Sequence, residues 1–400
     1  MYIGKNLRRL IAASLVVGSL TFMPVTNAEI QTYTGVGEYI MSDFETPEIA
    51  KQRAKQYAER NAQEQAGVYV SSYSRVENFK LAEDEIITMT NGILSVTNVK
   101  YDIITIPEHA GIVYRATIQA NIDTDRVDEW LSKGVGERSE LVAKNQALQK
   151  AIDDQEKQIA DLKKQLEKVK NDKDEEKIKT QFEAADKIFL SNQKLQEGDE
   201  QFRWDNDLAL TFYNEAIDLN PNNGAAYFSR GCVYIEFQQY SEAADDFNKA
   251  LSLNINSATL YNNLGYALTE LQQYDRAKTY LNKAVSLNPK YSEAYNNLGH
   301  LYIKLQKYNE ALNYLKKAES MNTASDNIYA NLGIAYFELQ DYENALYNLD
   351  NSIELNSNIP YTLRLRAKCY RMLGNEQQAN IDDERAEGLE NGTAERMPVG

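Results

Sequence analysis

The sequence of 400 residues is long enough for several modules. Hydrophobic residues make up 43% and charged residues 26%, with only 19 glycines and 7 prolines, which excludes collagen-like and wholly disordered chains. The net charge of -16, without a basic stripe, argues against nucleic acid and anionic membranes as partners. Two cysteines and two histidines leave little material for a metal site or a histidine-dependent triad, so we expect no cofactor and no enzymatic activity.

Residues 1–28 have the pattern of a secretory signal peptide. Lys5, Arg8 and Arg9 precede an apolar run from residue 10 to residue 20, and small residues lie around Ala28. The run is shorter than the ~20 residues of a membrane-spanning helix, and no second long apolar stretch follows it. We therefore expect a cleaved signal and a periplasmic or secreted protein. An uncleaved N-terminal anchor is the alternative.

A small domain of mixed α and β structure is predicted for residues 29–132. A helix that Thr46 caps, with Pro47 in its first turn and Gly67 at its end, separates two of the expected strands. Alanine recurs at every fourth residue of this helix, from Ala50 to Ala66, so its smooth face can lie close against an antiparallel sheet. Alternating segments rich in Val, Ile, Tyr and Thr predict strands at 34–41, 68–76, 93–106 and 112–122.

The same segment resembles the N-terminal domain of the flagellar assembly protein T family. The residues that carry the resemblance are Gly35-Val36-Gly37-Glu38-Tyr39, Gln65-Ala66-Gly67-Val68, Gly92-Ile93-Leu94 and the stretch 114–120. The resemblance covers about a quarter of the chain and implies a periplasmic assembly setting, not a reaction. The pair Gly35 and Gly37 lacks the third glycine of a phosphate-binding loop, and we interpret it as a bulged strand.

Residues 133–187 are predicted to form a short coiled coil or helical linker. Two seven-residue series, offset by four, mark the core positions of heptads. The first series is Leu141, Leu148, Gln155, Leu162 and Val169, and the second is Asn145, Ile152, Ile159, Leu166 and Lys173. A buried Asn weakens a coiled coil but fixes its register, so we expect a homo-oligomer, a parallel dimer or trimer. The alternative is a lone solvated helix of ~50 Å.

A period of 34 residues dominates residues 188–393. Alanine, glycine and tyrosine recur in columns at this spacing. The columns are Ala209, Ala243, Ala277, Ala311, Ala345 and Ala379; Gly231, Gly265, Gly299 and Gly333; Tyr240, Tyr274, Tyr308 and Tyr342. They closely resemble the tetratricopeptide repeat (TPR), which implies six stacked helix pairs.

The first and last repeats depart from the columns. Glu197 stands in the glycine column of the first unit, and Asp383 replaces a large apolar residue in the last, so we interpret both as caps. Residues 394–400 form a tail. The expected fold class is an α+β N-terminal domain, a short coiled coil and an all-α TPR solenoid, mostly α overall.

In the TPR family the first helix of each unit lines a concave groove. The resemblance places these residues of this sequence there: Asn262, Asn263, Tyr266, Asn296, Asn297, His300, Ile303, Asn331, Ile334, Phe337, Arg364, Lys368 and Arg371. Asn263, Asn297 and Asn331 recur once per repeat. A carboxamide offers donors and an acceptor, so such a column can pair with the main chain of an extended peptide. The alternative is that these amides satisfy neighbouring groups or water.

The last unit is locally basic, with Arg364, Arg366, Lys368 and Arg371 on its first helix. These residues are suited to a partner's acidic segment or C-terminal carboxylate, although a solvated helix face is the alternative.

The sequence as a whole predicts an extracytoplasmic scaffold or adaptor that binds partner proteins through the groove, in the assembly of the cell envelope or of surface appendages. A periplasmic chaperone or assembly factor is the alternative. A third hypothesis is an enzyme that uses the 29–132 domain, but the sequence of that domain lacks a nucleophile–base pair.

Overall fold

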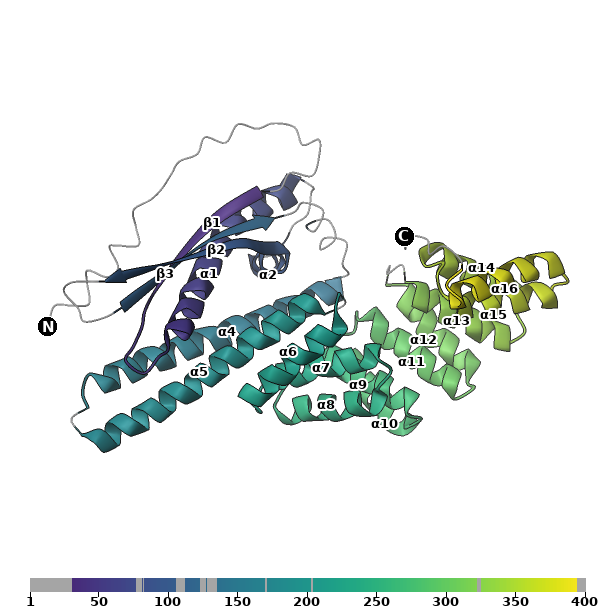
Figure 1. Cartoon of the computed structure of the whole chain (residues 1–400). Helices are drawn as coiled ribbons and strands as arrows, with labels where there is room; N and C mark the ends of the chain where they lie inside the picture. The colour runs from purple at the N-terminus through teal and green to yellow at the C-terminus, as the bar shows by residue number, and fades with distance from the viewer. Residues whose placement is uncertain are drawn as a thin grey trace.

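The computed structural model describes residues 31–76, 81, 83–105, 112–122, 127, 135–169, 171–202, 204–321 and 325–393. The predicted signal peptide and the 394–400 tail lie outside these residues. Figure 1 shows three parts in chain order: a small sheet with helices, a long helical hairpin and a solenoid of helix pairs. The expected fold class is confirmed.

The N-terminal part is a three-stranded antiparallel sheet covered by a helix on one face. The strands are β1 (Gln31–Ile40), β2 (Leu94–Thr105) and β3 (Ile112–Ile122), in the order β1-β3-β2. Gly35 of β1 and Val99 of β2 both lie opposite Ile118 of the central strand. The helices are α1 (Pro47–Val76) and α2 (Glu83–Ile93).

Helix α1 lies very close to the sheet, as its alanine stripe predicts. The Thr46 hydroxyl caps it by accepting a hydrogen bond from the backbone N–H of Ile49 at 3.3 Å. Below the helix, a Cβ atom on Gly35 would lie 2.0 Å from the carbonyl oxygen of Ala58. The prediction of a bulge in β1 is wrong: its register is regular, and the glycines are there because α1 leaves no room for a side chain. All five alanines of the stripe are fully buried: Ala50, Ala54, Ala58, Ala62 and Ala66.

The prediction of a strand at 68–76 is wrong, because α1 continues to Val76. Gly67 lies inside the helix. Val70 follows Ala66 by one helical turn, and both are fully buried against Met89 of α2 and its neighbours. The valines and tyrosines of this segment favour a strand by composition, but the apolar contact offered by α2 decides in favour of a helix.

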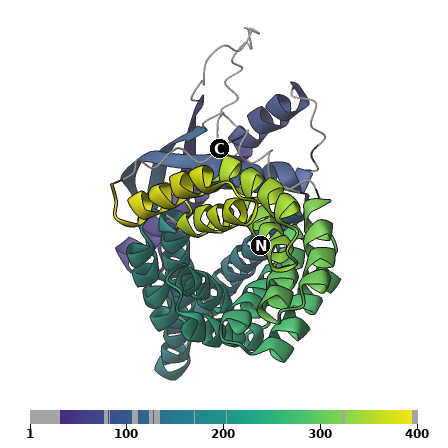
Figure 2. The same cartoon turned by 90° about the vertical axis from the view of Figure 1, so that its right-hand side faces the viewer.

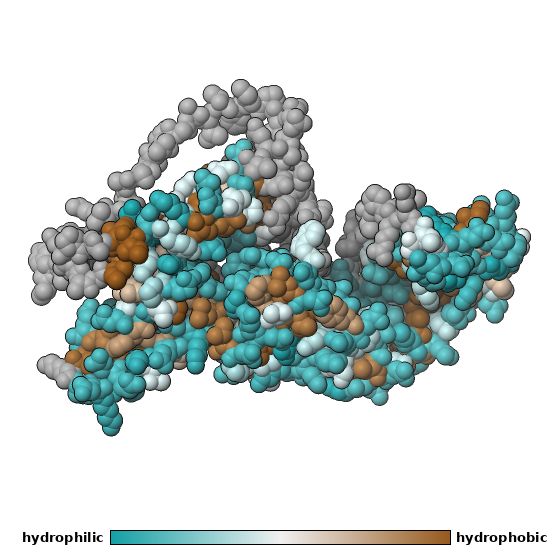
Figure 3. Space-filling view, in the orientation of Figure 1, coloured by the Kyte–Doolittle hydropathy of each residue, from teal (hydrophilic) through white to brown (hydrophobic). Residues whose placement is uncertain are grey.

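The predicted coiled-coil segment forms a hairpin within one chain. Helices α4 (Val135–Leu166) and α5 (Asp172–Gln201) are joined by a short turn in which Asn171 caps α5. Leu162 is buried against Phe182, and the side chain of Gln155 donates to the carbonyl oxygen of Ala185 at 2.8 Å. Part of the heptad face is thus covered by α5, so the lone solvated helix is wrong. Homo-oligomerisation stays a prediction; hydrophobic side chains are visible along the hairpin (Figure 3).

A buried cluster of charges joins α1 to the hairpin. Nη2 of Arg53 lies 2.9 Å from Oδ1 of Asp186 on α5, and its Nε lies 3.4 Å from Glu45. Glu45 also accepts a hydrogen bond from the hydroxyl of Tyr39 and lies 3.6 Å from Nζ of Lys163 on α4. Burial raises the pKa of Asp186 and lowers the pKa of Lys163. Separating these partners would leave buried charges without compensation, so the cluster fixes the domain on the hairpin.

The solenoid consists of six helix pairs within the described residues, and α5 supplies the first helix of the first pair. Figure 2 shows these helices, from teal to yellow, curving around an open centre, while Figure 1 places α5 and α16 at opposite ends. The remaining helices are α6 (Asn206–Leu219), α7 (Gly224–Glu236), α8 (Tyr240–Ser252), α9 (Ala258–Glu270), α10 (Tyr274–Leu287), α11 (Ser292–Lys304), α12 (Tyr308–Glu319), α13 (Asp326–Glu338), α14 (Tyr342–Leu355), α15 (Pro360–Met372) and α16 (Glu376–Glu390).

The alanine and glycine columns lie where the paired helices touch. Every alanine of the 34-residue column is fully buried. A Cβ atom on any of the four column glycines would lie 2.5 to 2.7 Å from a large side chain on the second helix, such as Leu315 for Gly299. In the first repeat Gly198 fills this role against Tyr213, so the prediction that Glu197 replaces the glycine is wrong by one residue. The glycine of that repeat is one residue nearer to its alanine, Ala209, than in the other repeats.

The turn between the two helices of a repeat contains one residue in the left-handed region. The following residue closes the turn, as where the N–H of Gln273 donates to the carbonyl of Leu268 at 2.8 Å. Glutamine adopts this conformation at a cost of about 1 kcal/mol that glycine avoids. The residues recur every 34 positions, with φ of 57° at Gln238, 59° at Gln272, 57° at Gln306, 61° at Gln340 and 81° at Gly374.

Two repeats carry a buried ion pair where the three repeats between them carry leucine. Arg366 of α15 forms two hydrogen bonds of 2.7 Å with Asp382 of α16, whose side chain is almost fully buried. Arg230 pairs with Asp246 in the same way in the second repeat. Leu264, Leu298 and Leu332 occupy this position in the repeats between. The ion pairs therefore lie toward the two ends of the solenoid.

We predict that Gly299→Ala destabilises the solenoid by about 1–3 kcal/mol, because Leu315 must move away from the new methyl group. Gly92→Ala is the matched control: its Cβ would meet nothing within 4 Å, and a helical alanine should stabilise α2 by about 0.5–1 kcal/mol. Denaturant unfolding followed by circular dichroism measures both. Equal effects of the two substitutions would contradict the role given to Gly299.

We also predict that Arg366→Leu destabilises the last repeat by about 3–5 kcal/mol, because Asp382 is left buried and unpaired. Adding Asp382→Asn reproduces the pair Leu332 and Asn348 of the preceding repeat and should restore most of the loss. Hydrogen exchange of α15 and α16 measures this locally. A double variant no more stable than the single one would show that the ion pair is not the cause.

A polar groove on the first helices of the central repeats

A hollow of about 480 Å³ lies along the first helices of the second to fifth repeats. Because these helices recur at one-repeat spacing, side chains at equivalent positions line up across the hollow. Seven of the predicted groove residues line it: Asn262, Asn263, Tyr266, Asn296, Asn297, His300 and Asn331. The structure therefore brings seven of the predicted residues together in one hollow.

Asparagine amides form hydrogen bonds from one repeat to the preceding one. Nδ2 of Asn297 donates to Oδ1 of Asn262 at 2.9 Å, and Nδ2 of Asn331 donates to Oδ1 of Asn296 at 2.9 Å. Asn262 and Asn296 are buried acceptors, whereas Asn297 and Asn331 are half-buried. Nδ2 of Asn263 lies 3.5 Å from the sulfur of Cys232 in the repeat before. The alternative in which these amides satisfy neighbouring groups is thus partly correct.

Each donor amide still has hydrogen-bonding capacity beyond these bonds. A carboxamide carries two N–H donors and an oxygen with two lone pairs. Among the described residues, the bonds above use one N–H of Asn297 and one N–H of Asn331, and no bond to either carbonyl oxygen is formed. The column can therefore hold its own orientation and bind a second polar group.

A hydrogen-bonded triad of Glu270, His300 and Lys304 lies beside the amides. Oε1 of Glu270 lies 2.6 Å from Nε2 of His300, and Oε2 lies 3.0 Å from Nζ of Lys304. The hydrogen bond with His300, followed by that with Lys304, lowers the pKa of Glu270 to about 2, although burial acts in the opposite direction. An ionised carboxylate only accepts, so Nε2 of His300 donates in this pair.

The ring of Tyr266 forms part of the wall. It lies 6.0 Å from the ring of His300 and 5.9 Å, edge to face, from Tyr240. Burial, the hydrogen bond with Tyr240 and the charges of Glu270 and Glu236 raise the pKa of Tyr266. The phenol therefore stays neutral at physiological pH.

Three predicted apolar groove residues lie outside this hollow. Ile303 packs on the central core of the solenoid, and Ile334 and Phe337 pack beside Leu349 of the fifth repeat. Phe337 also contacts the ring of Tyr342 at 5.7 Å. All three are half-buried, so packing within the chain uses part of the surface expected for a partner.

The basic residues of the last repeat are largely paired within the chain. Arg364 contacts Glu390 at 2.5 Å, and Arg371 contacts Asp383 at 2.5 Å and Glu376 at 3.2 Å. These carboxylates neutralise the positive charges of Arg364 and Arg371, which the sequence predicted to bind an acidic partner. Lys368 is exposed.

Several residues of the hollow were not predicted from the sequence. Glu236 ends α7, Tyr291 precedes α11 and Ser325 precedes α13, so they lie at helix ends. The prediction considered the interior of each first helix only. The 34-residue period contains the missing signal, because helix ends also align in a stack. The full set of unpredicted lining residues is Glu236, Tyr291, Glu293, Ser325, Asn327 and Ile328.

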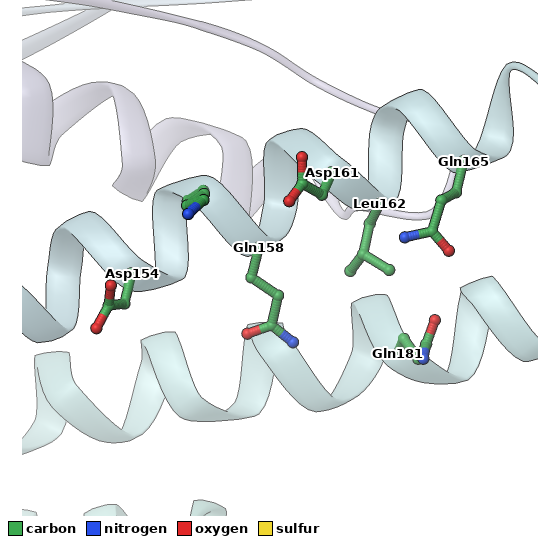
Figure 4. Close-up of a pocket in the computed structure, with 7 residues that line it drawn as sticks. Asp154, Gln158, Asp161, Leu162, Gln165 and Gln181 are labelled. Carbon is green, nitrogen blue, oxygen red and sulfur yellow. The ribbon is translucent and has the colours of Figure 1, made fainter.

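A second hollow, of about 370 Å³, lies on the hairpin. Figure 4 shows Leu162 pointing from α4 toward α5, with Gln158 and Gln165 beside it and Gln181 on the opposite helix. Its polar side chains form no column and carry charges of both signs, which gives it no defined ligand preference. In the described ranges, no helix is long and apolar enough to cross a membrane, and no group of three or more His, Cys, Asp or Glu side chains is placed to hold a metal ion.

The paired helices, the 34-residue columns and the groove on the first helices define the C-terminal half of the chain as a helical-repeat solenoid. Residues 212–244, 256–324 and 297–357 match models of the tetratricopeptide repeat. The solenoid therefore contains tetratricopeptide repeats. Tetratricopeptide repeat protein 28 of Homo sapiens is 33% identical over 69 residues, which are 17% of this chain and only 2% of that protein's length.

Several solved structures are similar to the solenoid. PilW, described as a widely conserved type IV pilus biogenesis factor, is 25% identical over 52% of this chain and 95% of its own, with a TM-score of 0.44. YrrB, described as a TPR protein with an unusual peptide-binding site, is 26% identical over 52% of this chain and 96% of its own, with a TM-score of 0.35. PilF of Pseudomonas aeruginosa is 20% identical over 52% and 94%, with a TM-score of 0.43.

We predict that Glu270→Gln lowers stability at neutral pH by about 1 kcal/mol, since water still reaches this partly buried triad and screens its charges. The folded pKa of Glu270 lies below its ordinary value of 4.5, so its contribution is present above about pH 4.5 and is lost as the pH falls toward 2. Unfolding of both proteins between pH 7 and pH 2 measures the difference. A difference that persists undiminished at pH 2 would exclude the carboxylate as its source.

Proposed function

We propose that this protein is an extracytoplasmic scaffold or adaptor that binds an extended segment of a partner protein along the amides of the groove. The observation that carries the proposal is the set of amide hydrogen bonds between repeats. Asn297 and Asn331 each donate one N–H to an asparagine of the preceding repeat, and each keeps a second N–H and its carbonyl oxygen for a partner. A fixed amide loses little rotamer freedom on binding, which favours affinity.

The spacing of the amides suits an extended main chain. Neighbouring packed helices lie ~8–10 Å apart, and an extended chain rises ~3.3 Å per residue, so successive amides meet about every third residue of a bound segment. Main-chain hydrogen bonds of this kind are independent of the partner's side chains. The groove can therefore accept segments of different sequence that share an extended form.

The proposed localisation and the proposed role in assembly are supported by the N-terminal sequence. The basic and apolar pattern of residues 1–28 supports export, and the resemblance of the 29–132 segment to the flagellar assembly protein T family supports assembly of the cell envelope or of surface appendages. The N-terminal domain is mounted on the hairpin by buried charges, so it and the groove belong to one scaffold.

We predict that Asn297→Ala together with Asn331→Ala reduces recovery of partner proteins from the envelope fraction at least several-fold. Both variants remove main-chain contacts to the partner and leave Asn262 and Asn296 without their donors, which costs about 1–3 kcal/mol of stability but not the fold. Affinity purification with identification of the bound proteins measures the effect.

Asn348→Ala is the matched control, because it removes a buried amide whose Nδ2 donates to the carbonyl of Asn344 at 2.8 Å on α14, outside the groove. It should lower stability to a similar extent and leave partner recovery unchanged. Undiminished recovery by the double groove variant would contradict the proposed function.

A further inference from the structure

The charges that line the hollow are mainly negative. Glu236, at the end of α7, and Glu293, in the first turn of α11, both face the hollow that contains the amides. Both are exposed, and among the described residues neither carboxylate forms a salt bridge. Glu293 accepts a hydrogen bond from the Ser292 hydroxyl at 3.0 Å, which orients it without neutralising it.

A third carboxylate, next to the hollow, is already compensated. Glu270 lies 2.6 Å from Nε2 of His300 and 3.0 Å from Nζ of Lys304, so the N–H donors of both side chains are directed at Glu270. The lining of the hollow contains no lysine or arginine. Glu236 and Glu293 thus keep their negative potential for a ligand, in a chain whose net charge is also negative.

Aromatic rings complete the wall. Tyr266 and Tyr291 line the same hollow as the two carboxylates. Neutral tyrosine rings attract cations through their faces, and they also cover the aliphatic part of a long side chain. The volume of about 480 Å³ has room for one such side chain together with part of a main chain.

We propose that the hollow holds a lysine or arginine side chain of the bound segment, whose charge the carboxylates of Glu236 and Glu293 attract and whose stem lies against a tyrosine ring, while the asparagine amides hold the main chain. This inference rests on the proposed function, because it names the partner for the same groove: an extended segment with a cationic residue. The amides bind any extended chain, and the carboxylates select among such chains by charge.

The test uses the full chain and labelled extended peptides of about ten residues, built from Ser, Thr and Val, that differ only at the central residue. One peptide carries Lys, one Gln and one Glu. Fluorescence anisotropy at low salt should show the Lys peptide binding about fivefold more tightly than the Gln peptide, and the Glu peptide more weakly than both. The preference should decrease as salt is added, since both carboxylates are exposed to solvent.

The variant Glu236→Gln with Glu293→Gln should bind the Lys and Gln peptides equally, with little change for the Gln peptide. Glu310→Gln, an exposed glutamate in the first turn of α12, is the matched control and should keep the fivefold preference. A preference that survives in the double glutamine variant, or equal binding of the two peptides by the unsubstituted protein, overturns the cationic pocket and leaves main-chain binding intact.

The variant Asn297→Ala with Asn331→Ala separates the two proposals. It should weaken all three peptides to a similar degree and preserve the ratio between Lys and Gln. Binding of all peptides that is unchanged in this variant contradicts the amide groove, whatever the charge preference. Absence of binding by every peptide to the unsubstituted protein contradicts both proposals.

Discussion

Close approach of one backbone to another is the constraint on which the whole structure depends. In the N-terminal domain, α1 lies so near β1 that glycine is required at Gly35, and alanine faces the sheet along the helix. In the solenoid, glycine and alanine are buried at the crossing of each helix pair, where large side chains of the second helix fill the space. Because each repeat positions the next one, an error in one crossing would be passed along the stack and would misalign the groove.

Residues whose role is set by local period could be predicted from the sequence, and residues whose role depends on a distant partner could not. The alanine column and the helix pairs follow from the 34-residue spacing. The end of α1 could not be predicted, since the helical form of Val70 depends on its cover by α2. The heptad face of α4 was recognised, but a heptad does not reveal whether its partner is another chain or the next helix, here α5. Glycine at Gly374 indicates a left-handed turn residue, but glutamine at the equivalent positions does not, so those turns could not be predicted.

The candidate site shows the same division. The period places Asn263, Asn297 and Asn331 on equivalent helix faces, and the structure confirms that they share one hollow. The diagonal bonds, from Asn297 to Asn262 and from Asn331 to Asn296, depend on the rotation between neighbouring repeats, which a single sequence does not specify. For the same reason the carboxylates at helix ends were missed, although they give the groove its charge.

Helix α5 belongs to both the hairpin and the solenoid, and its rigidity fixes how the two are placed relative to each other. Its 30 residues, about 45 Å of helix, pack against α4 and carry Asp186, then continue as the first helix of the first repeat. No loop separates these two parts of α5, so bending there would require breaking helical hydrogen bonds. The contacts of α5 with α4 and with Arg53 of the sheet domain therefore set the direction in which the solenoid leaves the hairpin.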